Sequence, residues 1–281
     1  MDKFLAKIPA FSGFKIIYLV LYVILVVFIN ISILRFFSLA PIIFTYLGPI
    51  SLFFPVFGIL IMESIGLILV YQLWAKRVRF KEKYGALSYQ RVFLAGFTGV
   101  SIILSIGAFN IASFLIWQDP SWTTSSFQIF VIPLTSLISP FDLLFYLLRY
   151  VFGIFFILLG ILMVIRAVQI FGFDYMAVVY LYFPEESEIQ NHEIYSLLRH
   201  PTYSAGILIS LGGVLINQNI YSIIFWVIYY VGFYIHVHFV EEKELIQRFG
   251  DSYLDYRKKV PPFFVKPKNC FHFLKFVFTR K

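Results

Sequence analysis

The chain has 281 residues, of which 60% are hydrophobic and only 14% are charged, and its mean hydropathy is +0.84. A water-soluble domain of this length could not bury so much apolar surface, so the composition excludes an ordinary soluble protein. The single cysteine, Cys270, excludes an intramolecular disulfide and a cysteine-rich metal site.

Long apolar segments recur along the chain. Crossing about 30 Å of hydrocarbon takes roughly 20 apolar residues in a helix, because lipid offers backbone groups no other hydrogen-bond partners. Five segments have this character and a sixth is shorter: 16–34, 50–74, 92–117, 143–165, the short 203–216, and 220–240. The first run is too long for a removable signal peptide, so we expect a permanent anchor. The sequence therefore predicts an all-α, polytopic transmembrane helical bundle of about six spans.

Local features of these segments follow from individual residues. Pro55 is expected to kink the second span. Residues 127–138 are apolar but too few to cross a bilayer, so they are expected to lie in the outer membrane interface. Only residues 217–219 separate the last two apolar segments, which should therefore form a tight helical hairpin.

Glu63 lies in the middle of the second span, where an unpaired charge is costly. Two interpretations are open. An ionisable residue inside the membrane is a functional candidate by default, and the alternative, which we favour, is a buried carboxyl group that is hydrogen-bonded to Asn30 or Asn110.

The positive charges are distributed unequally between the two sides of the predicted bundle. With six spans, both termini and the loops after the second and fourth spans share one side. All but two of the 23 Lys and Arg residues, Arg35 and Arg149, fall on that side. This positive-inside pattern predicts a multi-pass protein with both termini in the cytoplasm. The net charge of +8, including the basic cluster at 76–83, is thus interpreted as contact with anionic membrane lipids and not with nucleic acid.

The chain divides into three parts by its chemistry. Residues 1–142 carry no recognised motif, residues 143–267 contain most of the clustered polar residues near helix ends, and residues 268–281 form a basic tail. The apolar spacing after residue 241 predicts a further helix that bends at Gly250 and ends at Pro261 and Pro262.

Two polar clusters flank the last hairpin on its cytoplasmic side, so the hairpin should bring them together. The first comprises Tyr195, Arg199, His200, Pro201 and Tyr203, and the second comprises His236, His238, Glu241, Glu242 and Glu244. Hydrogen-bond donors, acceptors and aromatic walls at the mouth of a helix pair suit a zwitterionic, nucleotide-like cofactor. A metal site is not expected, because residues two apart on a helix point in opposite directions.

The run EIYSLLRHPTY at 193–203 and the run EEKELIQRFGDSYLDYRKKVP at 241–261 together resemble the isoprenylcysteine carboxyl methyltransferase family. Its wider superfamily includes phospholipid N-methyltransferases. The resemblance covers roughly residues 143–265 and leaves residues 1–142 outside. It implies an integral membrane enzyme that transfers a methyl group from S-adenosyl-L-methionine to an apolar or lipid-like acceptor, with an isoprenylcysteine-like acceptor as one alternative.

The resemblance also implies roles for individual residues. It places the following at the cofactor: Glu188, Ile189, Gln190, Tyr195, His200, Pro201, Thr202, Tyr203, Glu241 and Glu242. Arg199 and His200 are the candidate catalytic residues, either by binding the cofactor carboxylate or, for His200, by accepting a proton. His236 and His238 are the candidate substrate-binding residues. They stand where prenylcysteine enzymes carry an arginine for the substrate carboxylate, and the absence of that arginine argues against such a carboxylate here.

Other interpretations remain open at this point. Glu241 and Glu242 could be solvated interface charges that balance those of Lys258 and Lys259. The protein could be an NADPH-dependent membrane reductase of related fold, or a non-catalytic transporter or scaffold, which Glu63 would favour. The sequence leaves the identity of the acceptor and the oligomeric state undetermined.

Overall fold

The computed structural model describes residues 15–85, 88–113, 142–171 and 188–279. All regular structure in these residues is helical, which confirms the all-α prediction. Within this part of the chain, five helices are long and apolar enough to cross a membrane, and a sixth apolar helix is shorter. The predicted interfacial segment at 127–138 lies outside the described residues.

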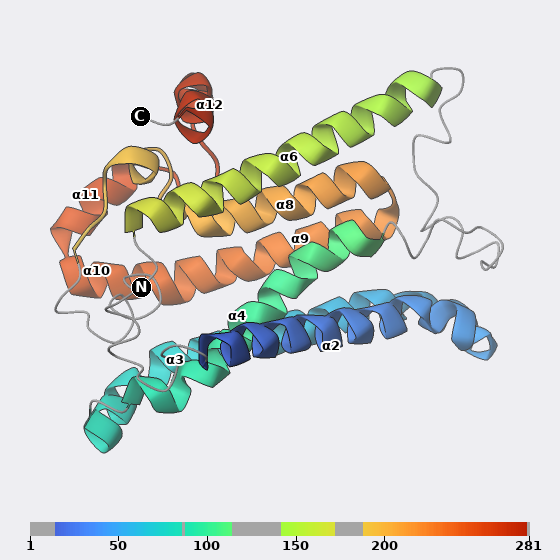
Figure 1. The fold of residues 1–281 in the computed structure, drawn as a ribbon, viewed down its shortest axis with the longest axis horizontal. Helices are drawn as coiled ribbons and strands as arrows, with labels where there is room; N and C mark the ends of the chain where they lie inside the picture. The colour runs from blue at the N-terminus through green and yellow to red at the C-terminus, as the bar shows by residue number, and fades with distance from the viewer. Residues whose placement is uncertain (1–14, 86–87, 114–141, 172–187, 280–281) are drawn as a thin grey trace.

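A helix forms at each predicted span, and successive helices run in alternating directions (Figure 1). Their bounds are α2 (Lys15–Ile43), α3 (Phe54–Tyr84), α4 (Ser88–Ala112), α6 (Asp142–Phe171), α8 (Pro201–Asn217) and α9 (Ile220–His236). The chain then continues through η10 (Val237–Glu241), α10 (Glu242–Phe249), α11 (Asp251–Lys259) and α12 (Cys270–Phe278). The end of α9, the start of α8, α10 and α11 therefore gather at one end of the bundle.

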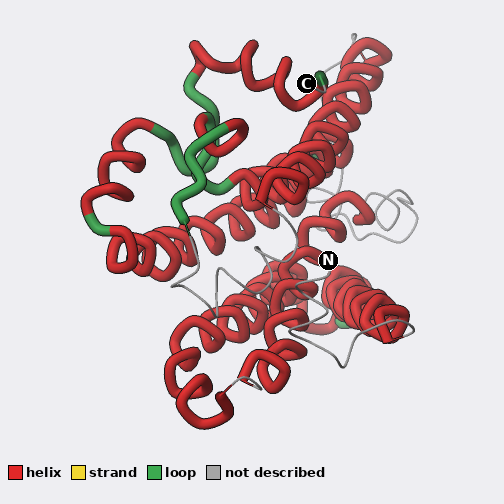
Figure 2. Tube along the Cα trace, turned by 60° about the vertical axis from the view of Figure 1, so that its left-hand side comes forward, coloured by secondary structure: helices red, strands yellow, loops and turns green. Residues whose placement is uncertain are grey.

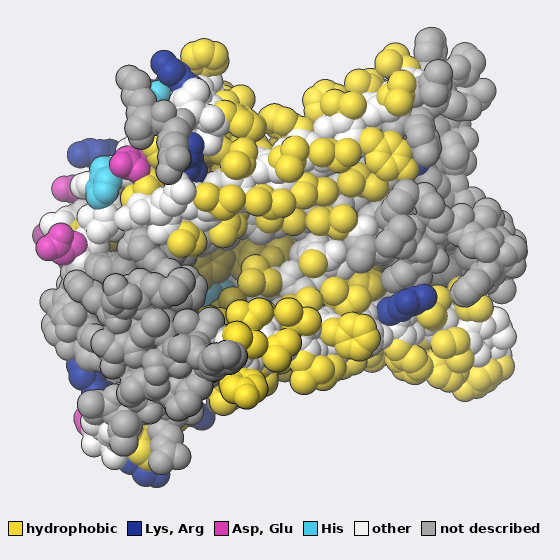
Figure 3. Space-filling view, in the orientation of Figure 1, with side chains coloured by type: hydrophobic (Ala, Val, Ile, Leu, Met, Phe, Trp, Pro, Cys, Tyr) yellow, Lys and Arg dark blue, Asp and Glu magenta, His cyan; other side chains and the backbone are white. Residues whose placement is uncertain are grey.

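The outer surface of the long helices is apolar. Ile24, Phe28 and Val151, which come from α2 and α6, each expose more than half of their surface. Figure 3 shows hydrophobic side chains over most of the visible described surface, with acidic side chains concentrated at the end where α10 and α11 lie. A water-soluble protein could not expose this much apolar surface, so the chain is an integral membrane protein.

Helix α8 packs very closely against α6 through small residues. A methyl group placed on Gly153 would lie 3.0 Å from the Gly212 carbonyl oxygen, and one placed on Gly212 would lie 2.6 Å from the Gly153 carbonyl oxygen. Gly160 is equally constrained, because a methyl group there would approach the Ala205 carbonyl oxygen to 2.7 Å. Small residues allow membrane helices to come this close. The short helix α8 is thereby fixed along the longer α6.

The turn between α8 and α9 is as tight as the sequence predicts. Gln218 adopts the left-handed conformation, with φ 51°, and its backbone N–H donates to Val214. The Asn219 side chain then caps α9 by accepting from the Ser222 backbone N–H at 2.8 Å. The Asn217 side chain donates to the Asn110 carbonyl oxygen at 2.6 Å, which ties the turn to α4.

The expectation that Pro55 kinks the second span is wrong. Pro55 lies in the first turn of α3, where a proline has no intrahelical hydrogen bond to lose. The change of direction comes earlier, at η2 (Thr45–Phe53), where Gly48 takes a φ of 57° before Pro49.

Of the expectation for Glu63, the burial is confirmed, but the hydrogen bond to Asn30 or Asn110 is wrong. The Asn110 side chain donates to Ser210 and to the Ser222 carbonyl oxygen, and the Asn30 side chain donates to the Val26 carbonyl oxygen in its own helix. The carboxyl group of Glu63 is buried, and neither of its oxygens has a hydrogen-bond partner among the described residues.

Candidate functional site

The acidic side of the site is formed where α9 passes into α10. Between them, η10 is a π-helical turn, which accommodates one extra residue without breaking the helix and is common at functional sites. The turn leaves His236, Glu241 and Glu242 buried, whereas His238 is exposed. Both carboxyl groups are therefore directed into the protein.

The opposite side of the site is the start of α8. Pro201 occupies its first turn, as is common for prolines, and His200 precedes it at the N-cap position. The His200 carbonyl oxygen accepts hydrogen bonds from the Ser204 backbone N–H at 3.0 Å and from its hydroxyl at 2.9 Å. These bonds fix the His200 backbone, and its imidazole ring is buried.

The chain after α11 returns to hold this segment in place. The Arg199 backbone N–H donates to the Pro261 carbonyl oxygen at 3.0 Å, and that of His200 donates to Pro262 at 3.1 Å. Because the two prolines end α11, their carbonyl groups are available for this pairing. Most of the described loop residues lie together in this region (Figure 2).

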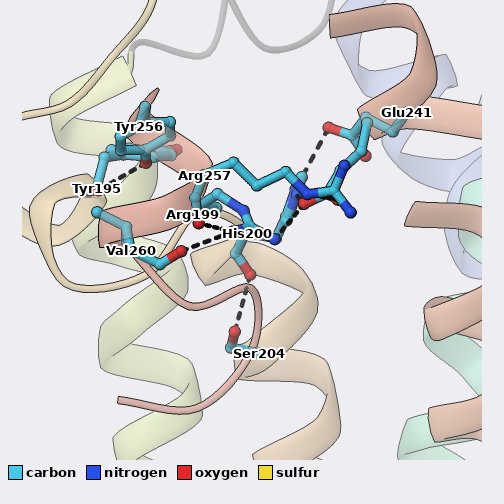
Figure 4. Close-up of polar contacts among 9 residues, drawn as sticks. Tyr195, Arg199, His200, Ser204, Glu241, Tyr256, Arg257 and Val260 are labelled. Atoms are coloured by element: carbon cyan, nitrogen blue, oxygen red, sulfur yellow. Dashed lines mark hydrogen bonds and ion pairs between the residues drawn. The ribbon is translucent and has the colours of Figure 1, made fainter. Parts of the chain in front are cut away.

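Side chains strengthen the same contact (Figure 4). The Arg199 guanidinium donates to the carbonyl oxygens of Arg257 at 2.8 Å and Val260 at 2.6 Å, at the end of α11. The Tyr256 hydroxyl donates to the Tyr195 carbonyl oxygen in η9 (Glu193–Ser196) at 2.6 Å. Helix α11 is thus attached at two points to the segment that runs from η9 to the start of α8.

Glu242 is at the centre of a buried ion network. Its Oε1 lies 2.5 Å from Arg199 Nη2 and 3.4 Å from His200 Nε2, and its Oε2 lies 3.3 Å from Arg257 Nε. The side chain of Glu242 is 3% exposed and that of Arg199 is 7% exposed. The alternative that Glu241 and Glu242 are solvated charges paired with Lys258 and Lys259 is therefore wrong. Lys258 pairs with the exposed Asp255 instead.

Glu241 belongs to a second group of contacts around His200. His200 Nδ1 lies 3.6 Å from Glu241 Oε1, and the Tyr203 hydroxyl donates to the same carboxyl group. The Tyr203 ring lies 5.0 Å from that of Phe233 and 6.2 Å from that of His236, centroid to centroid. Burial lowers the pKa of His200, but the neighbouring carboxylates of Glu241 and Glu242 outweigh this effect and raise it above the usual value.

The two predicted substrate-binding histidines lie apart. His236 is buried next to Tyr203, whereas His238 lies on the exposed face, where its ring stacks on Tyr234 with centroids 5.6 Å apart. Glu244 is also directed elsewhere, because it pairs with Arg77 of α3 at 2.7 Å and thereby joins α3 to α10.

The remaining predicted cofactor residues lie at the edge of this cluster. Pro201 is buried and Thr202 is half-buried in the first turn of α8. Glu188 is exposed, and Ile189 and Gln190 are half-buried, in the segment that leads into η9.

Four residues of the site were not among the sequence candidates: Tyr253, Tyr256, Arg257 and Phe263. The ring of Phe263 lies 6.2 Å from that of His200, and the buried Tyr253 hydroxyl has no hydrogen-bond partner within the described ranges. Burial raises the pKa of Tyr253, so its hydroxyl stays protonated. Three of the four lie within the 241–261 run, where their spacing indicates only a helix face.

Comparison with known proteins gives one match. Residues 148–252 match the family model of the phospholipid methyltransferases, and this range contains His200, Tyr203, Glu241 and Glu242. No curated protein and no solved structure matches the chain. This family consists of integral membrane methyltransferases related to the isoprenylcysteine carboxyl methyltransferases, and residues 148–252 are similar to it.

Proposed function

We propose that this protein binds S-adenosyl-L-methionine from the cytoplasm and methylates an apolar or lipid-like acceptor that arrives laterally from the bilayer. The observation that carries the proposal is that His200 and Tyr203 meet the buried Glu241 across the last hairpin, inside the range that matches a methyltransferase family. The start of α8 and the end of α9 lie beside α10 and α11 at one end of the bundle, so we assign that end to the cofactor and the spans to the acceptor (Figure 1).

The residues present fit this cofactor. S-adenosyl-L-methionine carries a sulfonium cation and an ammonium group, which suit a buried carboxylate such as Glu241 and the faces of Tyr203 and Phe233. Buried polar atoms normally have partners, and in the described part of the chain the Tyr253 hydroxyl has none. A polar ligand at this position would supply a hydrogen bond to it.

The contacts separate residues that position the site from residues that would contact the cofactor. Glu242 and Arg199 bind each other and the end of α11, so we assign them positioning roles. Tyr195, His200, Pro201, Thr202 and Tyr203 are proposed to line the cofactor, with Glu241 accepting hydrogen bonds from its ammonium group or ribose.

When bound, the cofactor supplies a methyl group on a sulfonium, and its positive charge is dispersed as the methyl group moves. Such a reaction depends on positioning and on exclusion of water more than on strong acid or base chemistry. The burial of His200, Glu241 and Glu242 provides both conditions.

Calorimetric titration of the detergent-purified protein tests the proposal. We expect binding of S-adenosyl-L-methionine, and a loss of affinity of about 10-fold to 100-fold in Glu241→Gln, since a hydrogen bond to a charged group contributes about 1.5–3 kcal/mol. Asp255→Asn, the same kind of change at an exposed position, should bind normally.

The same titration with NADPH separates the rival functions. Binding of NADPH without binding of S-adenosyl-L-methionine would identify a reductase and refute the proposal. Unchanged binding of S-adenosyl-L-methionine in both Glu241→Gln and His200→Ala would show that the cofactor pocket lies elsewhere. Binding of neither cofactor would favour a transporter or scaffold.

A further inference from the structure

Buried polar atoms without partners continue from the proposed cofactor site into the membrane-spanning part of the bundle. Both carboxyl oxygens of Glu63, the Tyr229 hydroxyl and His236 Nε2 are buried, and none has a hydrogen-bond partner in the ranges that the structure describes. An unpaired polar group is expensive in an apolar environment, and an ionisable one in a membrane span usually serves a function.

Glu63 of α3 lies directly against α9. A methyl group placed on Gly232 would lie 2.0 Å from Glu63 Oε1 and 2.7 Å from its Cδ, so only a glycine leaves room for this carboxyl group. Gly232 and His236 are four residues apart on α9, which places them on the same face, separated by about one helical turn. The carboxyl group of Glu63 therefore lies about one turn deeper in the bundle than His236.

Tyr229 adds a third polar group to the same region. Its hydroxyl is enclosed by glycines of two other helices, because it would lie 3.2 Å from a methyl group on Gly107 and 3.0 Å from one on Gly206. Tyr229 is also near enough to Glu63 for an electrostatic interaction.

Aromatic rings connect these groups to the cofactor site. The ring of Tyr229 lies 4.5 Å from that of Phe233, and the ring of Phe233 lies 5.0 Å from that of Tyr203, which bonds Glu241. In Figure 3 the apolar surface is also recessed between the helices drawn in the upper and lower halves of the view. A series of ring contacts thus links the polar atoms within the spans to the proposed cofactor site.

We propose that Glu63, Tyr229 and His236 bind the polar head of the methyl acceptor, and that this head is an N–H or O–H donor and not a carboxylate. This inference rests on the proposed function. A carboxyl group such as that of Glu63 offers acceptor oxygens to a hydroxyl or amine, whereas a carboxylate head has no hydrogen to donate and would bring an unpaired charge into an apolar region. Because α3 lies outside residues 148–252, the N-terminal part of the chain would contribute Glu63 to the selection of the acceptor.

Three probes with the same alkyl chain and different heads test the proposal. Equilibrium binding of radiolabelled dodecylamine, dodecan-1-ol and dodecanoate is measured on the full-length protein in lipid nanodiscs. We expect the amine and the alcohol to bind at least about tenfold more tightly than the carboxylate, a ratio that corresponds to about 1.4 kcal/mol. Glu63→Gln, which preserves the shape of the side chain, should reduce the ratio to near one. The control Glu82→Gln makes the same change at an exposed position of α3 and should keep the ratio.

The outcomes separate this inference from the proposed function. Equal binding of the three probes by the unmodified protein, or a preference that persists in Glu63→Gln, would overturn the inference even if S-adenosyl-L-methionine binds. Absence of S-adenosyl-L-methionine binding would overturn the proposed function, whatever the probes show. If Glu63→Gln fails to fold, Glu63→Asp provides a second test, because it keeps the carboxyl group and shortens the side chain. It should weaken amine binding while the carboxylate remains excluded, and unchanged amine binding would contradict the inference.

Discussion

Replacing Glu242 by glutamine is expected to destabilise the protein strongly, because it breaks a buried ion network. The side chains of Glu242 and Arg199 are 3% and 7% exposed, and their charged atoms lie 2.5 Å apart. Removing one partner of a buried pair costs about 3–5 kcal/mol, since the other charge stays buried without its counter-ion. Arg199 keeps its hydrogen bonds to the carbonyl oxygens of Arg257 and Val260, which places the expected cost near the lower limit, about 3 kcal/mol.

Thermal unfolding in detergent measures this effect. A loss of about 3 kcal/mol corresponds to a decrease in apparent Tm of roughly 6–12 °C for a protein of this size. The exposed pair of Asp255 and Lys258 provides the control, and Asp255→Asn should leave the Tm unchanged because solvent screens that pair. If Glu242→Gln unfolds at the same temperature as Asp255→Asn, the network does not hold the end of α11 to the start of α8, and the assignment of positioning roles is wrong.

Three further predictions follow from other contacts. The pKa of His200 lies above its ordinary value of 6.5, because two carboxylates outweigh the opposing effect of burial. The stabilising contribution of His200 should therefore be complete below pH 6.5 and lost as the pH rises through the raised pKa. Apparent Tm measured against pH should show this loss, and His200→Gln should abolish the pH dependence. Gly232→Ala should lower the Tm by pushing its methyl group against the Glu63 carboxyl group, and Glu63→Ala should restore part of the loss in the double variant; purely additive effects would contradict this contact. Tyr256→Phe removes the hydrogen bond to the Tyr195 carbonyl oxygen and should cost about 1 kcal/mol in unfolding free energy, with weaker binding of S-adenosyl-L-methionine in calorimetry; unchanged values of both would show that this bond positions nothing.

Local sequence signals predict the backbone of the C-terminal part well. Gly250, with a φ of 56°, separates α10 from α11, and α11 ends before Pro261 and Pro262. The turn at 217–219 is equally tight in the structure. The bend at Gly250 and the end of α11 depend on the backbone dihedral preferences of single glycine and proline residues, which can be predicted from the residue type alone.

Features that depend on tertiary contacts could not be predicted in the same way. The residues that flank the π-helical turn, which directs Glu241 inward, have ordinary helical dihedral angles. No residue with an unusual backbone preference therefore indicates the position of this turn in the sequence. The partners of Arg199 lie 58 and 61 residues away, and their carbonyl oxygens carry no sequence signature. For Glu63, an asparagine partner was the favoured expectation, but the Asn110 amide already donates to Ser210 of α8 and to Ser222 of α9.

Transfer of a radiolabelled methyl group from S-adenosyl-L-methionine into a membrane lipid extract tests the central claim most directly. The purified protein should place the label in an apolar product bearing a methylated nitrogen, oxygen or sulfur, and Glu241→Gln should lose most of this activity whereas Glu82→Gln keeps it. Absence of label in the lipid fraction, together with absence of S-adenosyl-L-methionine binding by the same preparation, would contradict the assignment of this site as a methyltransferase centre.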